Sequence, residues 1–177
     1  SPSNPESACA SEKYWRALEV CGLKIVFLEA DPRFPDSTFV EDVAILTHRG
    51  AILTRPGAES RRGEVAGIRD TLAGYFTTVR EIESPGTLDG GDICQAGSHF
   101  FIGISKRTNE EGARQLAQLL QQDGFTASFV GIKTTRAILH LKSGLAYLGD
   151  NRLALIRDLA GREEFAGYEI VPVEAAE

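Results

Sequence analysis

The sequence predicts an α/β fold built from a repeated unit of strand hairpin, helix and strand. A hairpin pattern, an amphipathic helix pattern and a short strand pattern follow one another, and this order recurs along the chain. The period is about 50 residues, since Asp42 and Asp92 are 50 residues apart and Asp89 and His140 are 51 apart. Each of these residues stands at the start of a hairpin, so units arranged around an axis would bring them together. A sheet protein with coincidental periodicity is the alternative interpretation.

The N-terminal part of the chain predicts half a unit, and one full unit follows it. A helix is expected over about 6–21, ended by Gly22, and "LKIVFLEA" at 23–30 predicts a strand. The segments of the first full unit are a hairpin over 43–54 with its turn at 48–50, a helix over 60–76 and a strand over 77–82.

Two further units predict the same order. The second is expected as a hairpin over 90–105, a helix over 108–124 and a strand over 125–132. The third is expected as a hairpin over 141–156, a short helix over 157–167 and a strand over 168–174. Thr108 and Glu111 have the spacing of a capping box at the start of the second helix, and Gly124 is expected to end it.

Composition limits the class of protein. The chain has 177 residues, a length sufficient for one globular domain over residues 1–177. The shares of hydrophobic residues, 42%, and of charged residues, 25%, are ordinary for a globular protein. The net charge of −6 argues against a nucleic-acid surface, and no apolar run approaches the roughly 20 residues of a membrane span. Three irregularly spaced cysteines predict neither a disulfide framework nor a metal knuckle, so a cytoplasmic location is expected. Because the sequence contains no Met, we expect it to be an excerpt of a longer chain, truncated at its ends.

Acidic residues and one histidine gather at the starts of the hairpins. They are Asp36, Glu41, Asp42, Asp89, Asp92 and His140. Such a cluster has three interpretations: a metal site, a solvated acidic rim, or a pocket for a cationic ligand such as a guanidinium group. The sequence lacks the HExxH and DxDxDG spacings of common metal sites.

Two arginines and the histidine extend the third interpretation. Arg61 and Arg107 precede helices at equivalent places, where the helix dipole does not favour a cation. Each indicates either a recognised anion or an exposed salt bridge. His140 is either a buried structural residue or an acid–base group. A pocket with carboxylates at one end and arginines at the other would suit an amino acid such as arginine.

Long motifs in the chain resemble a known enzyme family. They are "FVEDVAILT", "AILTRPGAESRRGE", "TLDGGDI", "FFIGISKRTNEEGA" and "LHLKSGLAYL". In this order they are similar to dimethylarginine dimethylaminohydrolases of the pentein superfamily, and the resemblance extends from about residue 10 onward. It implies a pentein-type α/β propeller of ββαβ blades, with about three and a half of five blades present. It also implies hydrolysis of asymmetric dimethylarginine to citrulline and dimethylamine without a cofactor or metal.

The resemblance also assigns roles to individual residues. His140 would be the catalytic acid and base, and Asp89 the acidic partner that orients it. The substrate-binding residues would be the acids Asp36, Glu41 and Asp42, together with Arg61 and Arg107 as the pair that holds the α-carboxylate of the substrate. The implied partner is a small molecule, methylated arginine, and neither nucleic acid nor membrane, with a homodimer as a candidate assembly.

The sequence departs from the family at the nucleophile. The family uses a Cys near its far C-terminus, and none of Cys9, Cys21 and Cys94 has that position. Cys94 lies within a predicted strand and is expected in the core. We therefore expect the nucleophile outside this chain and the isolated chain to be inactive. The alternatives are an arginine deiminase or amidinotransferase-like pentein, or a catalytically silent fragment that binds arginine-like ligands.

Overall fold

The computed structural model describes residues 5–174, which form two compact units divided between Ala30 and Asp31. In the first unit, helix α1 covers Pro5–Val20 and Gly22 follows it with a left-handed φ of 82°. The strand expected over 23–30 is not formed. A strand needs a neighbouring strand for its hydrogen bonds, and no strand of the described chain pairs with this segment. Trp15 instead packs edge-on against Phe27, with ring centroids 4.7 Å apart.

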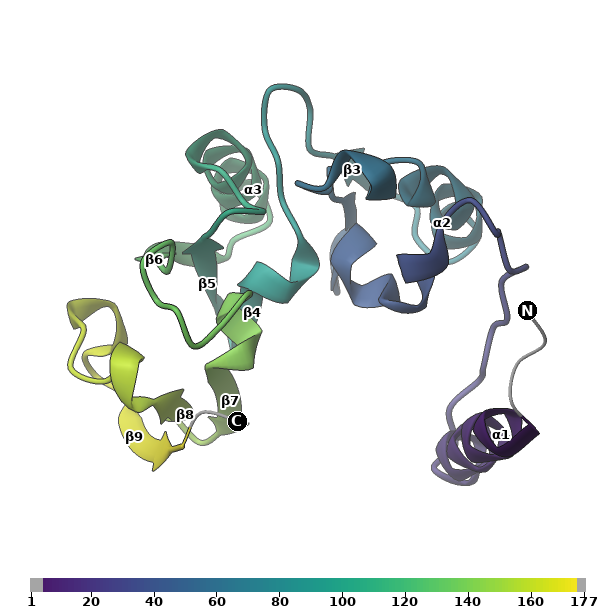
Figure 1. Ribbon diagram of the computed structural model, residues 1–177. Coiled ribbons are helices and arrows are strands. Elements are labelled where there is room, and N and C mark those ends of the chain that lie inside the picture. The colour runs from purple at the N-terminus through teal and green to yellow at the C-terminus, as the bar shows by residue number, and fades with distance from the viewer. Residues whose placement is uncertain (1–4, 175–177) are drawn as a thin grey trace. The chain divides into compact units, whose positions relative to one another are not determined.

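The second unit contains three three-stranded sheets, which follow one another in chain order (Figure 1). Their strands are β1 (Ala44–Thr47), β2 (Gly50–Leu53) and β3 (Val79–Glu81); β4 (Ile93–Ala96), β5 (His99–Ile104) and β6 (Thr126–Gly131); β7 (Leu145–Gly149), β8 (Arg152–Ile156) and β9 (Glu169–Val173). In each sheet the first two strands pair antiparallel and the third pairs parallel with the second. The predicted α/β class and the three hairpins are confirmed.

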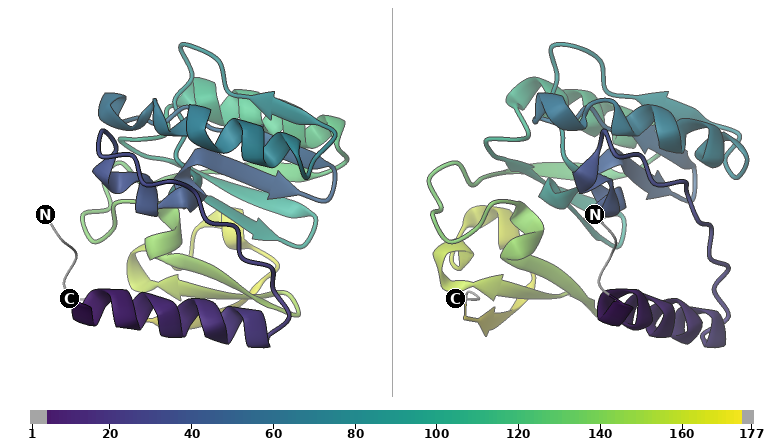
Figure 2. Two further views of the ribbon diagram at one scale, coloured as in Figure 1. Left: turned by 90° about the vertical axis from the view of Figure 1, so that its right-hand side faces the viewer. Right: turned by 45° about the vertical axis from the view of Figure 1, so that its right-hand side comes forward.

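A helix forms the crossover between the parallel strands in each of the first two sheets (Figure 2). Helix α2 (Glu64–Ala73) packs Ile68 and Leu72 against the first sheet, and helix α3 (Glu110–Gln122) packs Leu116 and Leu120 into the core of the second. The expected capping box at α3 is wrong. The side chain of Asn109 accepts the N–H of Gly112 at 2.8 Å and caps the helix instead.

The third crossover differs from the other two. Two 3₁₀ turns, Arg157–Leu159 and Glu163–Phe165, replace the helix expected over 157–167. Gly161 lies between them with a left-handed φ of 80°, which interrupts any continuous helix. Leu159 and Phe165 are buried in the core of the third sheet and so fill the place where a helix would pack. Within the described residues, no helix is both long and apolar enough to cross a membrane.

Within the second compact unit, buried carboxylates connect consecutive ββαβ repeats. Asp42 of the first repeat accepts the backbone N–H of Gly91 in the second repeat at 2.7 Å. Asp92 of the second repeat accepts the N–H of Leu141 in the third repeat at 3.0 Å. Acceptors and donors are both displaced by 50 residues along the chain, so the sequence repeat is also a repeat of contacts. These bonds hold the starts of the three hairpins against one another.

Candidate active site

The second compact unit contains a pocket of about 360 Å³ where the starts of the three hairpins meet. Its lining includes all seven residues that the sequence singled out as catalytic or substrate-binding: Asp36, Glu41, Asp42, Arg61, Asp89, Arg107 and His140. Phe39, Gly91, Leu139, Lys142 and Ser143 complete the lining. The structure therefore brings together residues spread over more than 100 positions of the sequence, although their chemical roles remain a prediction.

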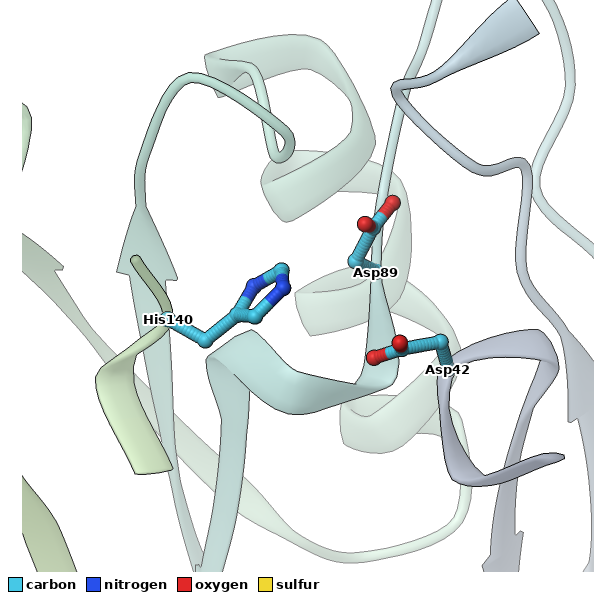
Figure 3. Close-up of side chains that lie close together, drawn as sticks. All are labelled: Asp42, Asp89 and His140. Carbon is cyan, nitrogen blue, oxygen red and sulfur yellow. The ribbon is translucent and has the colours of Figure 1, made fainter. Parts of the chain in front are cut away.

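Three short 3₁₀ turns position the central side chains. Asp42 lies in the turn Val40–Val43, Asp89 directly precedes the turn Gly90–Asp92, and His140 directly precedes a third turn just before β7. In Figure 3 the side chains of His140 and Asp42 extend toward each other, and Asp89 lies beside them. One ligand atom from each lies within 4.8 Å of the other two.

The Gly-Gly pair of "TLDGGD" lets these turns approach closely. A Cβ at Gly90 would lie 2.0 Å from the carbonyl oxygen of Glu41, and a Cβ at Gly91 would lie 2.9 Å from Cγ of His140. Neither contact is sterically acceptable. Glycine is therefore required here for the close approach of neighbouring repeats.

Asp89 is almost fully buried, with 1% of its surface exposed. Burial raises the pKa of this carboxyl and the nearby charge of Asp42 raises it further, while a hydrogen bond from Gly57 and the charges of His140 and Arg107 oppose the rise. The bond from the Gly57 N–H to Oδ1 of Asp89 is 2.8 Å long. Asp89 thus lies beside the imidazole as a buried acid held by the backbone.

His140 is surrounded by carboxylates. Its Nδ1 lies 3.5 Å from Oδ1 of Asp92, and its side chain is 18% exposed. The interaction with Asp92 raises the pKa of His140, burial opposes the rise, and the charges of Asp42 and Asp89 add to it. The site therefore favours the imidazolium form, which is the form that donates a proton.

Arg61 lies in the pocket wall with its donors already occupied. It donates to Oδ2 of Asp42 at 2.7 Å, to both carboxylate oxygens of Glu64, and to the carbonyl oxygens of Asp36 and Phe39. Burial lowers the pKa of its guanidinium, but the hydrogen bonds to Glu64 and Asp42 more than offset this, so the pKa is raised. The sequence analysis missed Glu64; its place three residues after Arg61, in the first turn of α2, was the available signal.

Arg107 is arranged differently. It is half-buried, and across the described residues no carboxylate pairs with its guanidinium. Its backbone N–H donates to the hydroxyl of Ser105 at 2.9 Å, which fixes the backbone at this position. Of the two arginines in the lining, Arg107 is therefore the one available to an anionic ligand.

Comparisons with known proteins identify the family. A family model described as arginine deiminase matches residues 29–174. The chain is 45% identical over 177 residues to a dimethylarginine dimethylaminohydrolase of Pseudomonas aeruginosa, covering 98% of this chain and 68% of that protein. This chain belongs to the dimethylarginine dimethylaminohydrolase family.

Further relatives agree with the assignment to the dimethylarginine dimethylaminohydrolase family. A member from Streptomyces coelicolor is 42% identical over 125 residues, covering 70% of this chain and 47% of that protein. A solved structure of the Pseudomonas aeruginosa enzyme, a Cys-to-Ser variant complexed with citrulline, matches with a TM-score of 0.88 at 44% identity, covering 97% of this chain and 67% of that chain. The chain thus spans about two thirds of one relative and about half of the other.

More distant proteins share the fold alone. The N-terminal domain of ArgZ, a cyanobacterial arginine dihydrolase, matches with a TM-score of 0.77 at 16% identity, covering 92% of this chain and 62% of that chain. Together with the family members, it confirms an α/β fold of the pentein superfamily for this chain.

Cys94 lies outside the pocket of this family member. It is on β4, only 6% exposed, and burial raises the pKa of its thiol. It lines a different cavity, of about 440 Å³, beside β1 and β7. The ion pair between Lys142 and Glu41, 3.0 Å long, lines both cavities and lies between them. The expectation that Cys94 belongs to the core is confirmed.

Asp42, Asp89 and His140 could together hold a divalent cation, because their ligand atoms are close enough. Protein donors already occupy much of this set. Asp42 accepts bonds from Arg61 and Gly91 on its two oxygens, and Asp89 accepts a bond from Gly57. The arrangement therefore suits hydrogen bonding and charge stabilisation better than coordination of a metal.

Proposed function

We propose that this protein hydrolyses asymmetric dimethylarginine or monomethylarginine to citrulline and a methylamine. The observation that supports this proposal most strongly is the composition of the pocket. Its lining contains His140, whose pKa is raised, together with buried acids and Arg107, which has no carboxylate partner among the described residues. Citrulline, the ligand bound to the Pseudomonas aeruginosa enzyme, is the product of this reaction, which supports the proposal. The fold would be the pentein propeller, with about three and a half of its five blades in this chain.

Substrate binding would use charge at both ends of the pocket. Arg107 would bind the α-carboxylate, with Arg61 beside it. Asp36 and Glu41 are exposed in the pocket and would receive the cationic groups of the substrate, with Asp42 held behind them by Arg61. A planar guanidinium pairs well with carboxylates through two parallel hydrogen bonds.

The chemical steps would need a cysteine that lies outside this chain. Its thiolate would attack the guanidinium carbon and form a C–S bond, while His140 donates a proton to the leaving amine as the C–N bond breaks. His140 would then take a proton from water, which attacks the thiouronium carbon. The C–S bond then breaks, the hydroxyl proton of the adduct passes to solvent, and citrulline and the thiolate are released. Asp89 would stabilise the imidazolium through its charge.

A second candidate function is arginine deimination, because the family model that matches is described as arginine deiminase. The same pocket would then release ammonia from arginine itself. An amidinotransferase-like activity and a silent arginine-binding role are the remaining alternatives. We also infer a single catalytic domain and a cytoplasmic location.

Turnover of methylated and unmodified arginine distinguishes these functions. The full-length protein is expected to produce citrulline and dimethylamine from asymmetric dimethylarginine, and His140→Ala should abolish both products. The 177-residue chain alone should be inactive, since no cysteine among the described side chains lines the pocket. Faster turnover of arginine than of its methylated forms would favour the deiminase. Turnover by the 177-residue chain that is lost in Cys94→Ser would place the nucleophile at Cys94 and contradict the mechanism.

A further inference from the structure

We propose that Asp92 is the positioning residue for His140, binding Nδ1 so that Nε2 faces the substrate pocket; this inference rests on the proposed function. The two atoms, Nδ1 of His140 and Oδ1 of Asp92, are 3.5 Å apart. Nδ1 is buried and has no closer hydrogen-bond partner within the described residues. A buried ring nitrogen needs a partner, and the acceptor beside it is Oδ1 of Asp92 at 3.5 Å.

Asp92 is held rigidly enough for this task. It is fully buried, and its Oδ2 accepts hydrogen bonds from the hydroxyls of Ser105 and Thr108, both 2.6 Å long. Its Oδ1 accepts the N–H of Leu141, the residue directly after His140, at 3.0 Å. The carboxylate is therefore fixed relative to the backbone of the histidine it would orient. A carboxylate held in this way sets the tautomer and orientation of an imidazole.

Asp89 and Asp42 lie at the other edge of the ring. In Figure 3 the imidazole of His140 extends from its Cβ toward these two carboxylates, which belong to the pocket lining. Asp42 and Asp89 raise the pKa of His140 through their negative charge, whereas the hydrogen-bonding interaction with Asp92 is the largest cause of the rise. The acids on the two sides of the ring thus have separate roles. Asp92 orients the ring through Nδ1, and Asp42 and Asp89 stabilise the charge of the imidazolium on the side that faces the pocket.

Other charged groups also face this region from the pocket lining. They are Glu41, Arg61, Arg107 and Lys142. Arg61 and Lys142 are paired with acidic residues, which limits their repulsion of the imidazolium. Arg107 is the remaining cation, so its removal should raise the proton affinity of His140 whichever acid orients the ring. Variants at Arg107 therefore cannot substitute for variants at Asp92 in the test.

The first test measures the tautomer of the unaltered protein. Long-range ¹H–¹⁵N correlation spectra at a pH above the pKa of His140 would show which ring nitrogen carries the proton. The chain has three histidines, so His48→Gln and His99→Gln assign the remaining signals. We expect the proton on Nδ1, facing Asp92. A proton on Nε2 would overturn the proposal, and this result needs no variant of Asp92 that folds.

The second test compares Asp92→Asn with Asp89→Asn. Asparagine keeps an oxygen for the N–H of Leu141 and removes the charge. We expect Asp92→Asn to lower the pKa of His140, measured by NMR titration, more than Asp89→Asn does. Its kcat for asymmetric dimethylarginine should fall at least about 10-fold with little change in KM. An unchanged pKa of His140 in a folded Asp92→Asn protein would show a purely structural role for Asp92.

The two readouts separate this inference from the proposed function. If the protein does not turn over methylarginine but the tautomer and the order of pKa changes hold, the proposed function fails and the role of Asp92 stands. If turnover is normal but the pKa of His140 responds to Asp89→Asn more than to Asp92→Asn, the role of Asp92 is wrong and the function stands. Ser105→Ala is the matched control, because it removes one bond to Asp92 and leaves its charge beside His140.

Discussion

Arg61 donates a hydrogen bond of 2.7 Å to Asp42, and both side chains are only 8% exposed. Glu64 accepts a second bond from the same guanidinium at 2.8 Å. One cation therefore lies between two buried anions at the wall of the pocket. Removal of one partner from such a set leaves uncompensated charge in a poorly solvated place. Arg61 is therefore expected to have a structural role in the pocket wall, whereas Arg107 is expected to bind substrate.

Replacement of Arg61 by Ala should strongly destabilise the protein, because Asp42 and Glu64 would lose their partner. We expect the free energy of unfolding to fall by roughly 3–5 kcal/mol, measured by urea denaturation at neutral pH. Arg62→Ala is the matched control, since Arg62 pairs with the exposed Glu59 and should change little. A loss as small as that of the control would show that the buried network contributes nothing to stability.

Replacement of Arg107 by Ala should act on substrate binding and leave stability nearly unchanged. The loss of a hydrogen bond to a charged group is expected to raise KM, equivalent to about 1.5–3 kcal/mol. Steady-state kinetics of the full-length protein with asymmetric dimethylarginine would measure this. Arg114→Ala provides the comparison, because Arg114 is an exposed arginine paired with Glu111 on α3. If both variants keep the KM of the unaltered protein, Arg107 does not hold the carboxylate.

The raised pKa of His140 should make its contribution to stability depend on pH. The folded state holds the proton more tightly than the unfolded state, whose histidine pKa is about 6.5. The stabilising contribution is therefore complete below about pH 6.5 and is lost as the pH rises through the folded pKa. Urea denaturation of the unaltered protein and of His140→Gln should show a difference that shrinks across this range. A difference that grows with pH would contradict the direction assigned to this pKa.

The described cysteines should differ in reactivity toward alkylating reagents. Cys21 is exposed, whereas Cys94 is buried and its pKa is raised by that burial, so little thiolate is available at Cys94. Native protein treated with iodoacetamide should be modified at Cys21, and at Cys94 only after denaturation, as read by peptide mass spectrometry. Cys94→Ser should leave the turnover of the full-length protein intact. Rapid native labelling of Cys94 would place its thiol at an accessible surface.

Local patterns in the sequence were sufficient for most of the secondary structure. The hairpin turns, the start of each sheet and helices α2 and α3 follow from alternation, helical spacing and glycine positions. The predictions failed where a partner far away in the chain decides the outcome. Residues 23–30 have a strand pattern but no strand beside them among the described residues, and Thr108 donates to Asp92 instead of capping α3.

The sequence by itself indicated which residues could meet, because the repeat of about 50 residues set Asp42 and Asp92, and likewise Asp89 and His140, at equivalent points of successive repeats. Only the tertiary structure decided what each side chain contacts. Equivalent positions carry no information on distance, burial or the direction of a donor. Packing of neighbouring turns gives Asp92 the place beside Nδ1 of His140 and occupies Arg61 with Asp42 and Glu64. A sequence motif can identify a residue, but the hydrogen bonds between neighbouring repeats determine what that residue does.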